Sequence, residues 1–552
     1  MPDHEERPMR QLSRRELLER GAVGGVSLSL AAWLAACGGG GGGGAENAAP
    51  ATTQAGATTA AATTTAAAGE AKRGGTLRVG VVGGAAADEQ LNPHVPTVSN
   101  LDVSRTEQIF SKLTDMAPDG SFQMQLAESM EPNTTADEWT VKLKSGVVWH
   151  DGSPLTADDV VYTYQRILDP KNDLGVAASN IDMIDPKGIE KIDDLTVRLR
   201  LVRPWADLPS QVGQRYDAII KAGTTTFEPG NINGTGPFKL RSWTPGEKYT
   251  LARNENYFEE GKPYVDGVEV IGINEPTARL NALQAGQVDA VELVDPSQVE
   301  VLKSNSDLAV LISPGGGWTP IYMNTQTAPF DDVRVRQAMK LLADRNKIVE
   351  VALQGYGDVG NDLFGRADPL YAKEIPQREY DPEQAVSLLK EAGVEGMDFT
   401  LHSSEAVPAM LSSALVFSQS AKDAGVKVTV KKHPVDSFWS QVYGKVSFGY
   451  SDWGYRPFLA QWIQSYSTYN KDETDWQNAQ AKKLIDEVAA TPDFEKRKQL
   501  ALEAQQLAWD EGGYIIWGFG QRIDGLSAKV QGITPHIFTS LGWFAFKDAY
   551  LA

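Results

Sequence analysis

The chain has 552 residues, of which 41% are hydrophobic, and its formal net charge at pH 7 is −20. This length is enough for two or three domains and a large core. The acidic balance argues against a nucleic-acid partner, because phosphate binding needs clusters of Lys and Arg, and the sequence holds no long basic run.

The first 37 residues are typical of an export signal that ends in a lipid anchor. Arg14 and Arg15 precede an apolar run that starts at Gly21 and is too short and glycine-broken to predict a durable membrane span. The segment Leu34-Ala35-Ala36-Cys37 resembles a bacterial lipobox, in which Cys37 receives the lipid. Cys37 is the chain's single cysteine, so no intramolecular disulfide can form. The alternative is a signal peptide with a chance cysteine.

Residues 38–73 predict a linker. They contain a glycine run followed by a mixture rich in Ala and Thr, without an aromatic side chain. Such a composition cannot build a packed core, so we expect a disordered tether that holds the folded body away from the membrane surface.

The folded body is predicted to begin at Gly74. Alternating apolar residues over 76–82 indicate a first strand, and 158–168 form an amphipathic helix that Thr156 can cap. Further strands are expected at 140–143, 196–201, 249–251, 268–273 and 427–430, and further helices around 484–488 and 500–507. This mixture without a fixed-period repeat predicts an α/β or α+β chain.

Three local motifs favour structural roles. His150-Asp151-Gly152-Ser153-Pro154 is turn chemistry that leads into the helix at 158–168. Gly234-Thr235-Gly236-Pro237 predicts a tight loop that feeds a strand, since it lacks the spacing and the Lys-Ser/Thr ending of a phosphate-binding loop. Arg334 and Arg336, close behind Asp331 and Asp332, are expected to pair or pack at a helix start.

A long, ordered series of segments carries a resemblance to a known family. The segments are 126–129, 139–144, 148–160, 234–238, 253–258, 283–289, 324–338, 344–345, 355–357, 381–385 and 388–393. Together they make the chain from Gly74 onward similar to the bacterial extracellular solute-binding proteins of family 5, which serve dipeptide and oligopeptide transport.

The resemblance implies an α/β fold of the two-lobe periplasmic-binding-protein type, with a small extra subdomain in the first lobe. It places the core of lobe I at 74–111, 233–271 and 525–552, its subdomain at 112–232, and lobe II at 272–524. Asn274-Glu275-Pro276 is the candidate hinge. The lobes are expected to close around a ligand.

Three segments are expected to line the cleft: 318–324, 360–362 and 450–457. The candidate ligand-binding residues are Trp318, Tyr322, Asn324, Asp362, Asp452, Trp453 and Arg456. In peptide-binding relatives an aspartate near 450–457 pairs with the ligand's amino terminus, and Asp452 is the nearest such residue.

The hypothesis for recognition is a clamp on a zwitterionic ligand such as a short peptide. Asp362 would hold the ligand's ammonium and Arg456 its carboxylate or phosphate, between the rings of Trp318 and Trp453. The alternative is that Arg456 pairs with a protein carboxylate and that both tryptophans belong to the core.

The sequence does not favour an enzyme. Its six histidines are scattered without zinc-ligand spacing, and no Gly-x-Ser-x-Gly motif is present. We expect no cofactor and no metal, and an exported hydrolase remains only a distant alternative.

The predicted function is that of a membrane-anchored, monomeric, extracytoplasmic substrate-binding component of an ABC importer. Its expected partners are a small solute, short peptides above all, the permease subunits, and the membrane through lipid on Cys37. Two alternatives keep the fold: a non-peptide ligand, namely an opine-like conjugate, a sugar or a metal chelate, or a sensor in place of an importer subunit.

Overall fold

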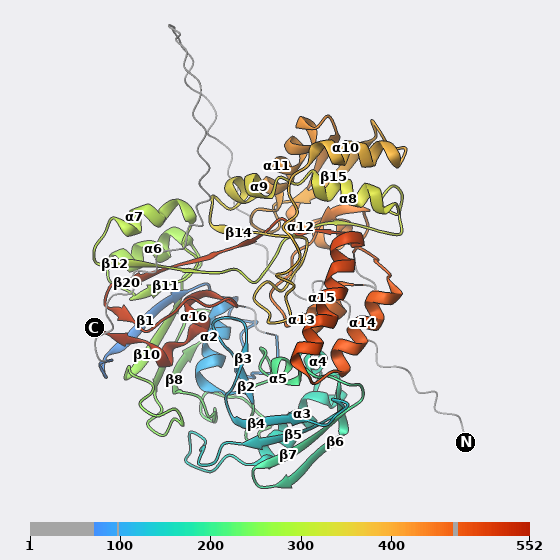
Figure 1. Ribbon diagram of the computed structural model, residues 1–552. Coiled ribbons are helices and arrows are strands. Elements are labelled where there is room, and N and C mark those ends of the chain that lie inside the picture. Colours follow the sequence, from blue (N-terminus) through green and yellow to red (C-terminus); the bar gives the residue numbers. More distant parts are fainter. Residues whose placement is uncertain (1–70, 97–98, 467–472) are drawn as a thin grey trace.

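The computed structural model describes residues 71–96, 99–466 and 473–552. The expectations for Arg14, Arg15, Cys37 and the linker up to residue 70 lie outside these ranges. The described chain forms two lobes, each built around its own sheet, with a third sheet below them in a subdomain (Figure 1). The predicted two-lobe α/β fold is confirmed.

Lobe I is built on a seven-stranded sheet in the order β12-β20-β11-β1-β10-β9-β8. The strands are β1 (Thr76–Val81), β8 (Phe238–Thr244), β9 (Lys248–Arg253), β10 (Gly267–Gly272), β11 (Ala290–Val291), β12 (Leu308–Ser313) and β20 (Arg522–Ser527). The central strand β1 runs parallel to both neighbours, β10 and β11. Its Leu77, Val79 and Val81 are fully buried, which explains the apolar alternation in the sequence.

Helices cover both faces of this sheet. On one face lie α2 (Asn100–Ile109) and the short α16 (Ser540–Phe544), and on the other lie α6 (Pro276–Gln284) and α7 (Val299–Lys303). The last described strand, β22 (Tyr550–Leu551), pairs antiparallel with β21 (Val530–Gln531). There Leu551 lies against Gly75, so the first and last described segments meet in lobe I.

The subdomain is an antiparallel sheet in the order β4-β5-β7-β6. Its elements are β4 (Ala127–Pro132), β5 (Glu138–Leu143), β6 (Ile184–Asp193), β7 (Thr196–Leu201), the hairpin β2 (Thr114–Met116) and β3 (Phe122–Met124), and the helices α3 (Ala157–Leu168), α4 (Gly175–Asn180) and α5 (Leu208–Gln211). The predicted helix start is confirmed, because Thr156 and Asp159 form a reciprocal capping box at the first turn of α3.

Lobe II is built on a five-stranded sheet in the order β16-β15-β17-β13-β18. These strands are β13 (Ile321–Met323), β15 (Asp398–Ser404), β16 (Lys427–His433), β17 (Phe448–Tyr450) and β18 (Tyr514–Ile515). The main helices are α8 (Val333–Leu341), α9 (Arg345–Ala352), α10 (Pro382–Glu391), α11 (Met410–Asp423), α13 (Phe458–Ser465), α14 (Ala479–Ala490) and α15 (Phe494–Glu511). A separate ladder pairs β14 (Gly357–Val359) with β19 (Gly518–Gly520).

Two segments connect the lobes: 314–320 runs from β12 to β13, and 516–521 runs from β18 to β20 (Figure 1). The predicted lobe boundary is therefore corrected. Residues 272–313 belong to lobe I, since β11 and β12 pair with β20 in its sheet. Asn274-Glu275-Pro276 leads into α6 within lobe I and is not the hinge. The sequence did not reveal this, because strand order within a sheet depends on pairing between distant segments.

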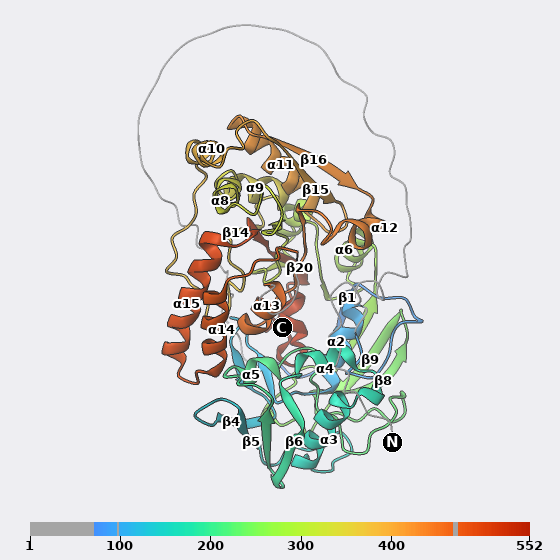
Figure 2. The same ribbon diagram turned by 90° about the vertical axis from the view of Figure 1, so that its right-hand side faces the viewer.

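The antiparallel pair α14 and α15 packs against the subdomain. Side chains of both helices share one hydrophobic cluster with the subdomain sheet. The backbone N–H of Ala206 donates to Ala489 at 2.7 Å, and Nη1 of Arg497 donates to the carbonyl oxygen of Ala206 at 2.6 Å. Both views show this pair reaching from lobe II down to the subdomain (Figures 1 and 2). The lobes are therefore linked by packing as well as by the two connecting segments.

The motifs assigned to structure keep those roles. Gly152 has φ +85° in the turn after His150, and a Cβ on Gly234 would lie 1.9 Å from the carbonyl oxygen of Ile109. Arg334 pairs with Asp332, while Arg336 donates to backbone carbonyls at 2.7 to 3.2 Å.

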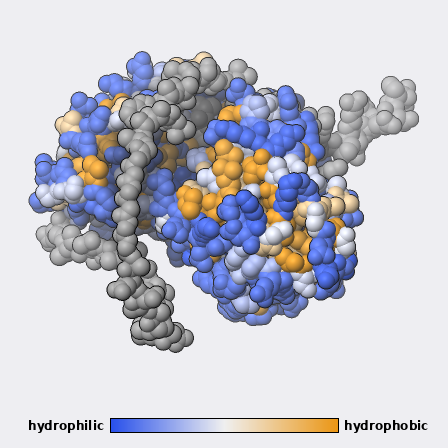
Figure 3. Space-filling model, turned by 90° about the horizontal axis from the view of Figure 1, so that it is seen from above, coloured by the Kyte–Doolittle hydropathy of each residue, from blue (hydrophilic) through white to orange (hydrophobic). Residues whose placement is uncertain are grey.

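The surface of the described part is largely hydrophilic, with smaller apolar groups between the charged residues (Figure 3). Within residues 71–96, 99–466 and 473–552, no helix combines the length and apolar character needed to cross a bilayer.

Candidate functional site

The site begins where the connecting segment 314–320 meets the loop 450–457. Trp318 and Trp453 exchange two backbone hydrogen bonds of 2.9 Å, which form an isolated antiparallel bridge. Beside it, the hydroxyl of Thr319 donates to Oδ1 of Asp452 at 3.0 Å, and Nε1 of Trp517 donates to the carbonyl oxygen of Thr319 at 2.8 Å. Both connecting segments and the predicted loop 450–457 thus meet at one place.

The two predicted tryptophans stack directly on each other. Their ring centroids are 5.8 Å apart with 12° between the planes, and Phe364 also stacks on Trp318 at 5.6 Å. Trp318 and Trp453 are only 3% and 6% exposed. The predicted sandwich, with a ligand between the rings, is therefore corrected: in this arrangement the rings fill the space that the ligand was expected to occupy.

A buried carboxylate that the sequence analysis did not single out supports this aromatic group. Glu473 is 2% exposed, and its two oxygens accept hydrogen bonds from Nε1 of Trp453 at 3.0 Å and from the hydroxyl of Tyr443 at 2.9 Å. These two bonds fix the orientation of the Trp453 ring.

Asp362 does not lie ready for a ligand. Its carboxylate accepts two bonds of 2.7 Å from Nη2 of Arg345 and one of 2.8 Å from Nε of Arg378. It is also almost fully buried, and Arg345 and Arg378 are the main groups that hold its pKa below the usual value against the effect of burial. The prediction that Asp362 binds a ligand ammonium is therefore corrected, because two guanidinium groups already neutralise its carboxylate.

Tyr322 and Asn324 also have structural surroundings. The Tyr322 ring is fully buried on β13, where its hydroxyl accepts a bond of 3.2 Å from the backbone N–H of Gly444. Oδ1 of Asn324 accepts from the backbone N–H of Gln326 at 3.0 Å and from the Thr327 hydroxyl at 3.1 Å, which is turn geometry. These contacts account for both residues without a ligand.

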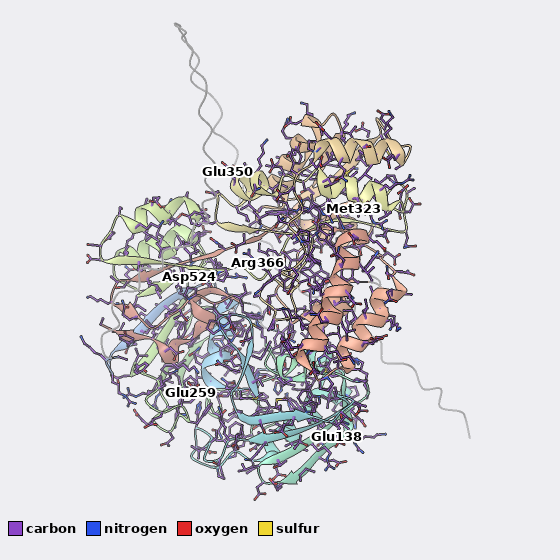
Figure 4. All side chains as sticks on the ribbon, viewed as in Figure 1. Glu138, Glu259, Met323, Glu350, Arg366 and Asp524 are labelled. Atoms are coloured by element: carbon purple, nitrogen blue, oxygen red, sulfur yellow. The ribbon has the colours of Figure 1, made fainter. Side chains whose placement is uncertain are left out.

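Asp452 and Arg456 remain the predicted residues that are half-buried at the lobe junction. Asp452 also acts electrostatically on Arg522, the first residue of β20, which the sequence analysis did not single out. Figure 4 marks the neighbourhood: Asp524 on β20 lies in lobe I, Met323 on β13 lies in lobe II, and Arg366 appears between them. In the described part of the chain, no three His, Cys, Asp or Glu side chains gather as a metal site.

Comparison with known proteins gives a consistent picture. The model of the bacterial extracellular solute-binding proteins, family 5, matches residues 121–475. The heme-binding protein A of Haemophilus influenzae is 26% identical over 477 residues, which cover 80% of this chain and 86% of that protein. The dipeptide-binding protein of Escherichia coli is 25% identical over 458 residues, which cover 77% and 85% respectively.

Solved structures share the fold. HbpA2 from Haemophilus parasuis matches with a TM-score of 0.76 and 21% identity, over 87% of this chain and all of that one. The periplasmic binding protein DppA from Helicobacter pylori, in complex with the peptide STSA, matches with a TM-score of 0.68 and 21% identity, over 87% and 98%. At these identities the likeness concerns the fold.

Proposed function

The chain belongs to family 5 of the bacterial extracellular solute-binding proteins, and from this membership we propose that it is the substrate-binding component of an ABC importer for short peptides. It captures the solute between its lobes outside the cytoplasmic membrane and passes it unchanged to the permease. A lipid on Cys37 and the linker behind it hold the protein near that permease.

One observation carries this proposal: two separate sheets are joined by the segments 314–320 and 516–521, which meet beside half-buried polar residues. Each segment contains glycine, whose backbone tolerates the changes in φ and ψ that hinge bending needs. Closure around such a hinge removes water from the solute, so each polar contact becomes stronger.

The relatives narrow the chemistry of the solute. One is named for dipeptides and another for heme, and both kinds of molecule carry carboxylates. Thr319 and Asp452 at the junction are polar and hydrogen-bond each other, and such surroundings suit a peptide better than a large apolar ring. We therefore propose peptides first, and a non-peptide carboxylate second.

The test is native mass spectrometry of the tag-free protein purified from its natural host. We expect an added mass that disappears on denaturation and that fragments as a short peptide. Refolded, ligand-free protein should bind that peptide again in calorimetry and release it without cleavage. Recovery of a hydrolysed product would contradict the binding role, and recovery of heme, a sugar or a metal chelate would contradict the peptide assignment.

A further inference from the structure

Two arginines at the lobe junction, Arg215 and Arg522, have no role in the function proposed above. Arg522 begins β20, opposite Ser313 on β12, where the segment 516–521 enters lobe I. Arg215 lies in the loop after α5 of the subdomain. They are far apart in the sequence, yet the charge of Arg215 acts on Arg522.

The direction of Arg522 follows from strand geometry. Side chains alternate along a strand, so Arg522 and Asp524 share one face of β20 while Ile523 takes the other. Ile523 packs in the cluster beneath α6 and α7, whereas Oδ2 of Asp524 accepts from the backbone N–H of Leu541 in α16 at 2.6 Å. Arg522 therefore faces the side of the sheet that carries the segment 536–544.

Arg215 approaches the same segment from the subdomain. Its guanidinium carbon lies 5.7 Å from the centre of the Phe538 ring and 5.8 Å from that of Trp543. Phe538 in turn meets Tyr455 of lobe II edge-on at 6.1 Å. The aromatic pair thus links Arg215 to the loop 450–457. Arg522 lies close to the same segment, because Ser313, its register partner on β12, accepts a hydrogen bond from the backbone N–H of His536 at 3.3 Å.

Neither guanidinium has a hydrogen bond or an ion pair with any residue of the described ranges 71–96, 99–466 and 473–552, and Nε of Arg215 is buried without an acceptor. A buried donor without a partner is costly, and the charge of Arg215 acts unfavourably on the Arg522 cation. Burial first, and the charge of Arg215 in addition, lower the pKa of Arg522. The two guanidinium groups therefore carry donors that no described protein group uses, and an anion can accept from them.

The neighbouring acids do not meet this need. The oxygens of Asp524 and Glu292 already accept hydrogen bonds: Asp524 from the backbone of Leu293 and Leu541, and Glu292 from Val82 and Asn100. Burial raises the pKa of Asp524 to about 6 and that of Glu292 to about 7, which reduces their negative charge near neutral pH. Asp452 acts on Arg522 from lobe II, and Glu107 lies within the field of Arg215 but pairs with Lys112.

We propose that Arg215 and Arg522 form the binding site for an anionic group, a carboxylate or a phosphate, of the captured solute. Two planar donor groups can together hold the several oxygens of such a group. The proposal rests on the proposed capture function and adds its charge requirement: the protein selects solutes with at least one negative charge. Asp452, half-buried at the same junction, then contacts the remainder of the solute.

The test compares two peptide mixtures on ligand-free protein: tri- to pentapeptides with free carboxylates, and the same peptides as carboxyl amides. We expect binding of the free acids and about ten- to a hundredfold weaker binding of the amides. This factor corresponds to the loss of one charge-assisted hydrogen bond. Arg522→Gln should remove this preference, and Arg215→Gln should reduce it. Arg198→Gln, on the exposed face of β7, removes the same charge and should change nothing.

The outcomes separate this inference from the function. If acids and amides bind equally, the anion site is refuted while peptide capture stands.

If neither mixture binds, peptide capture fails. Inorganic phosphate, succinate and glucose 6-phosphate then test the anion site alone: binding that depends on Arg522 supports the site, and no binding overturns it. A large fall in melting temperature for both Arg522→Gln and Arg215→Gln also overturns it, since removing mutual repulsion should not destabilise the free protein. If Arg522→Gln instead weakens acids and amides alike, and Asp452→Asn does the same, Arg522 serves an ion pair between the lobes and the anion site is overturned.

Discussion

His94 is a fully buried histidine that is held in its neutral form. Its Nε2 donates to the carbonyl oxygen of Ala218 at 2.7 Å, and its Nδ1 accepts from Nη1 of Arg166 at 2.6 Å. Because both ring nitrogens are engaged, the ring has no place for a second proton. Burial, together with the charge of Arg166, lowers the pKa of His94 from 6.5 to about 3.

This histidine predicts acid sensitivity. Below pH 6.5 the unfolded chain takes up a proton at His94 that the folded protein refuses until about pH 3, so the folded state loses stability across that window. The loss from this one group approaches about 1.4 kcal/mol per pH unit. Urea unfolding of His94→Gln should therefore show a shallower loss between pH 6.5 and 4 than the wild type.

The control for this prediction is His433→Gln on β16, since that ring lies partly in solvent and its loss should alter the slope less. Parallel stability curves for the wild type and His94→Gln would show that His94 is not the acid-sensitive group.

Some residues of the site could be predicted from the sequence, but several of their contacts could not. It predicted that 318–324, 360–362 and 450–457 line the cleft, and the bridge of Trp318 with Trp453 brings two of these segments together. It did not identify the partners of Asp362, because Arg345 and Arg378 lie 17 and 16 residues away and only the folded chain brings them together. Arg522 carried a weak signal, a charged residue within the apolar and glycine-rich run 513–526.

At the scale of the elements, the two connecting segments touch each other through glycine. A Cβ on Gly315 would lie 1.7 Å from the carbonyl oxygen of Gly520, which is a backbone atom that cannot swing away. The crossing of the two segments therefore depends on the absence of a side chain at this position.

Gly315→Ala should accordingly force the two segments apart. We expect a loss of about 1 to 3 kcal/mol in the free energy of unfolding, as for other overpacked sites. The matched control is Gly454→Ala, because a Cβ there meets no atom within 4 Å and the change should stay within about 0.5 kcal/mol. Equal denaturation midpoints for the two variants would contradict a tight crossing.

Pattern arguments predicted elements better than their assembly. The strand at 76–82 and the helix at 158–168 appear as β1 and α3, because period and capping are local properties. The boundary between the lobes was misplaced, since β11 and β12 join lobe I by pairing with β20, more than 200 residues later in the chain. No local pattern records such a pairing.

At the scale of the whole molecule, α14 and α15 tie lobe II to the subdomain. Arg497 is central to this contact, since it is 8% exposed and donates to the carbonyl oxygen of Ala206. Hinge motion must therefore either carry the subdomain along with lobe II or separate this interface.

Arg497→Ala leaves the Ala206 carbonyl without that donor and should weaken the interface by about 1 to 3 kcal/mol. Hydrogen exchange should become faster at 206–214 and along α14, while β1 and β10 in lobe I keep their protection. Lys496→Ala, which removes an exposed side chain from the same helix, serves as the control. Uniformly faster exchange throughout the molecule would indicate general destabilisation rather than a local tie.

The place where the chain enters the fold has a mechanical consequence. Gly75 and Leu551 touch in lobe I. A membrane tether that ends at residue 73 would therefore attach to lobe I and leave lobe II as the moving lobe. Closure would then move lobe II relative to the lobe that carries the anchor.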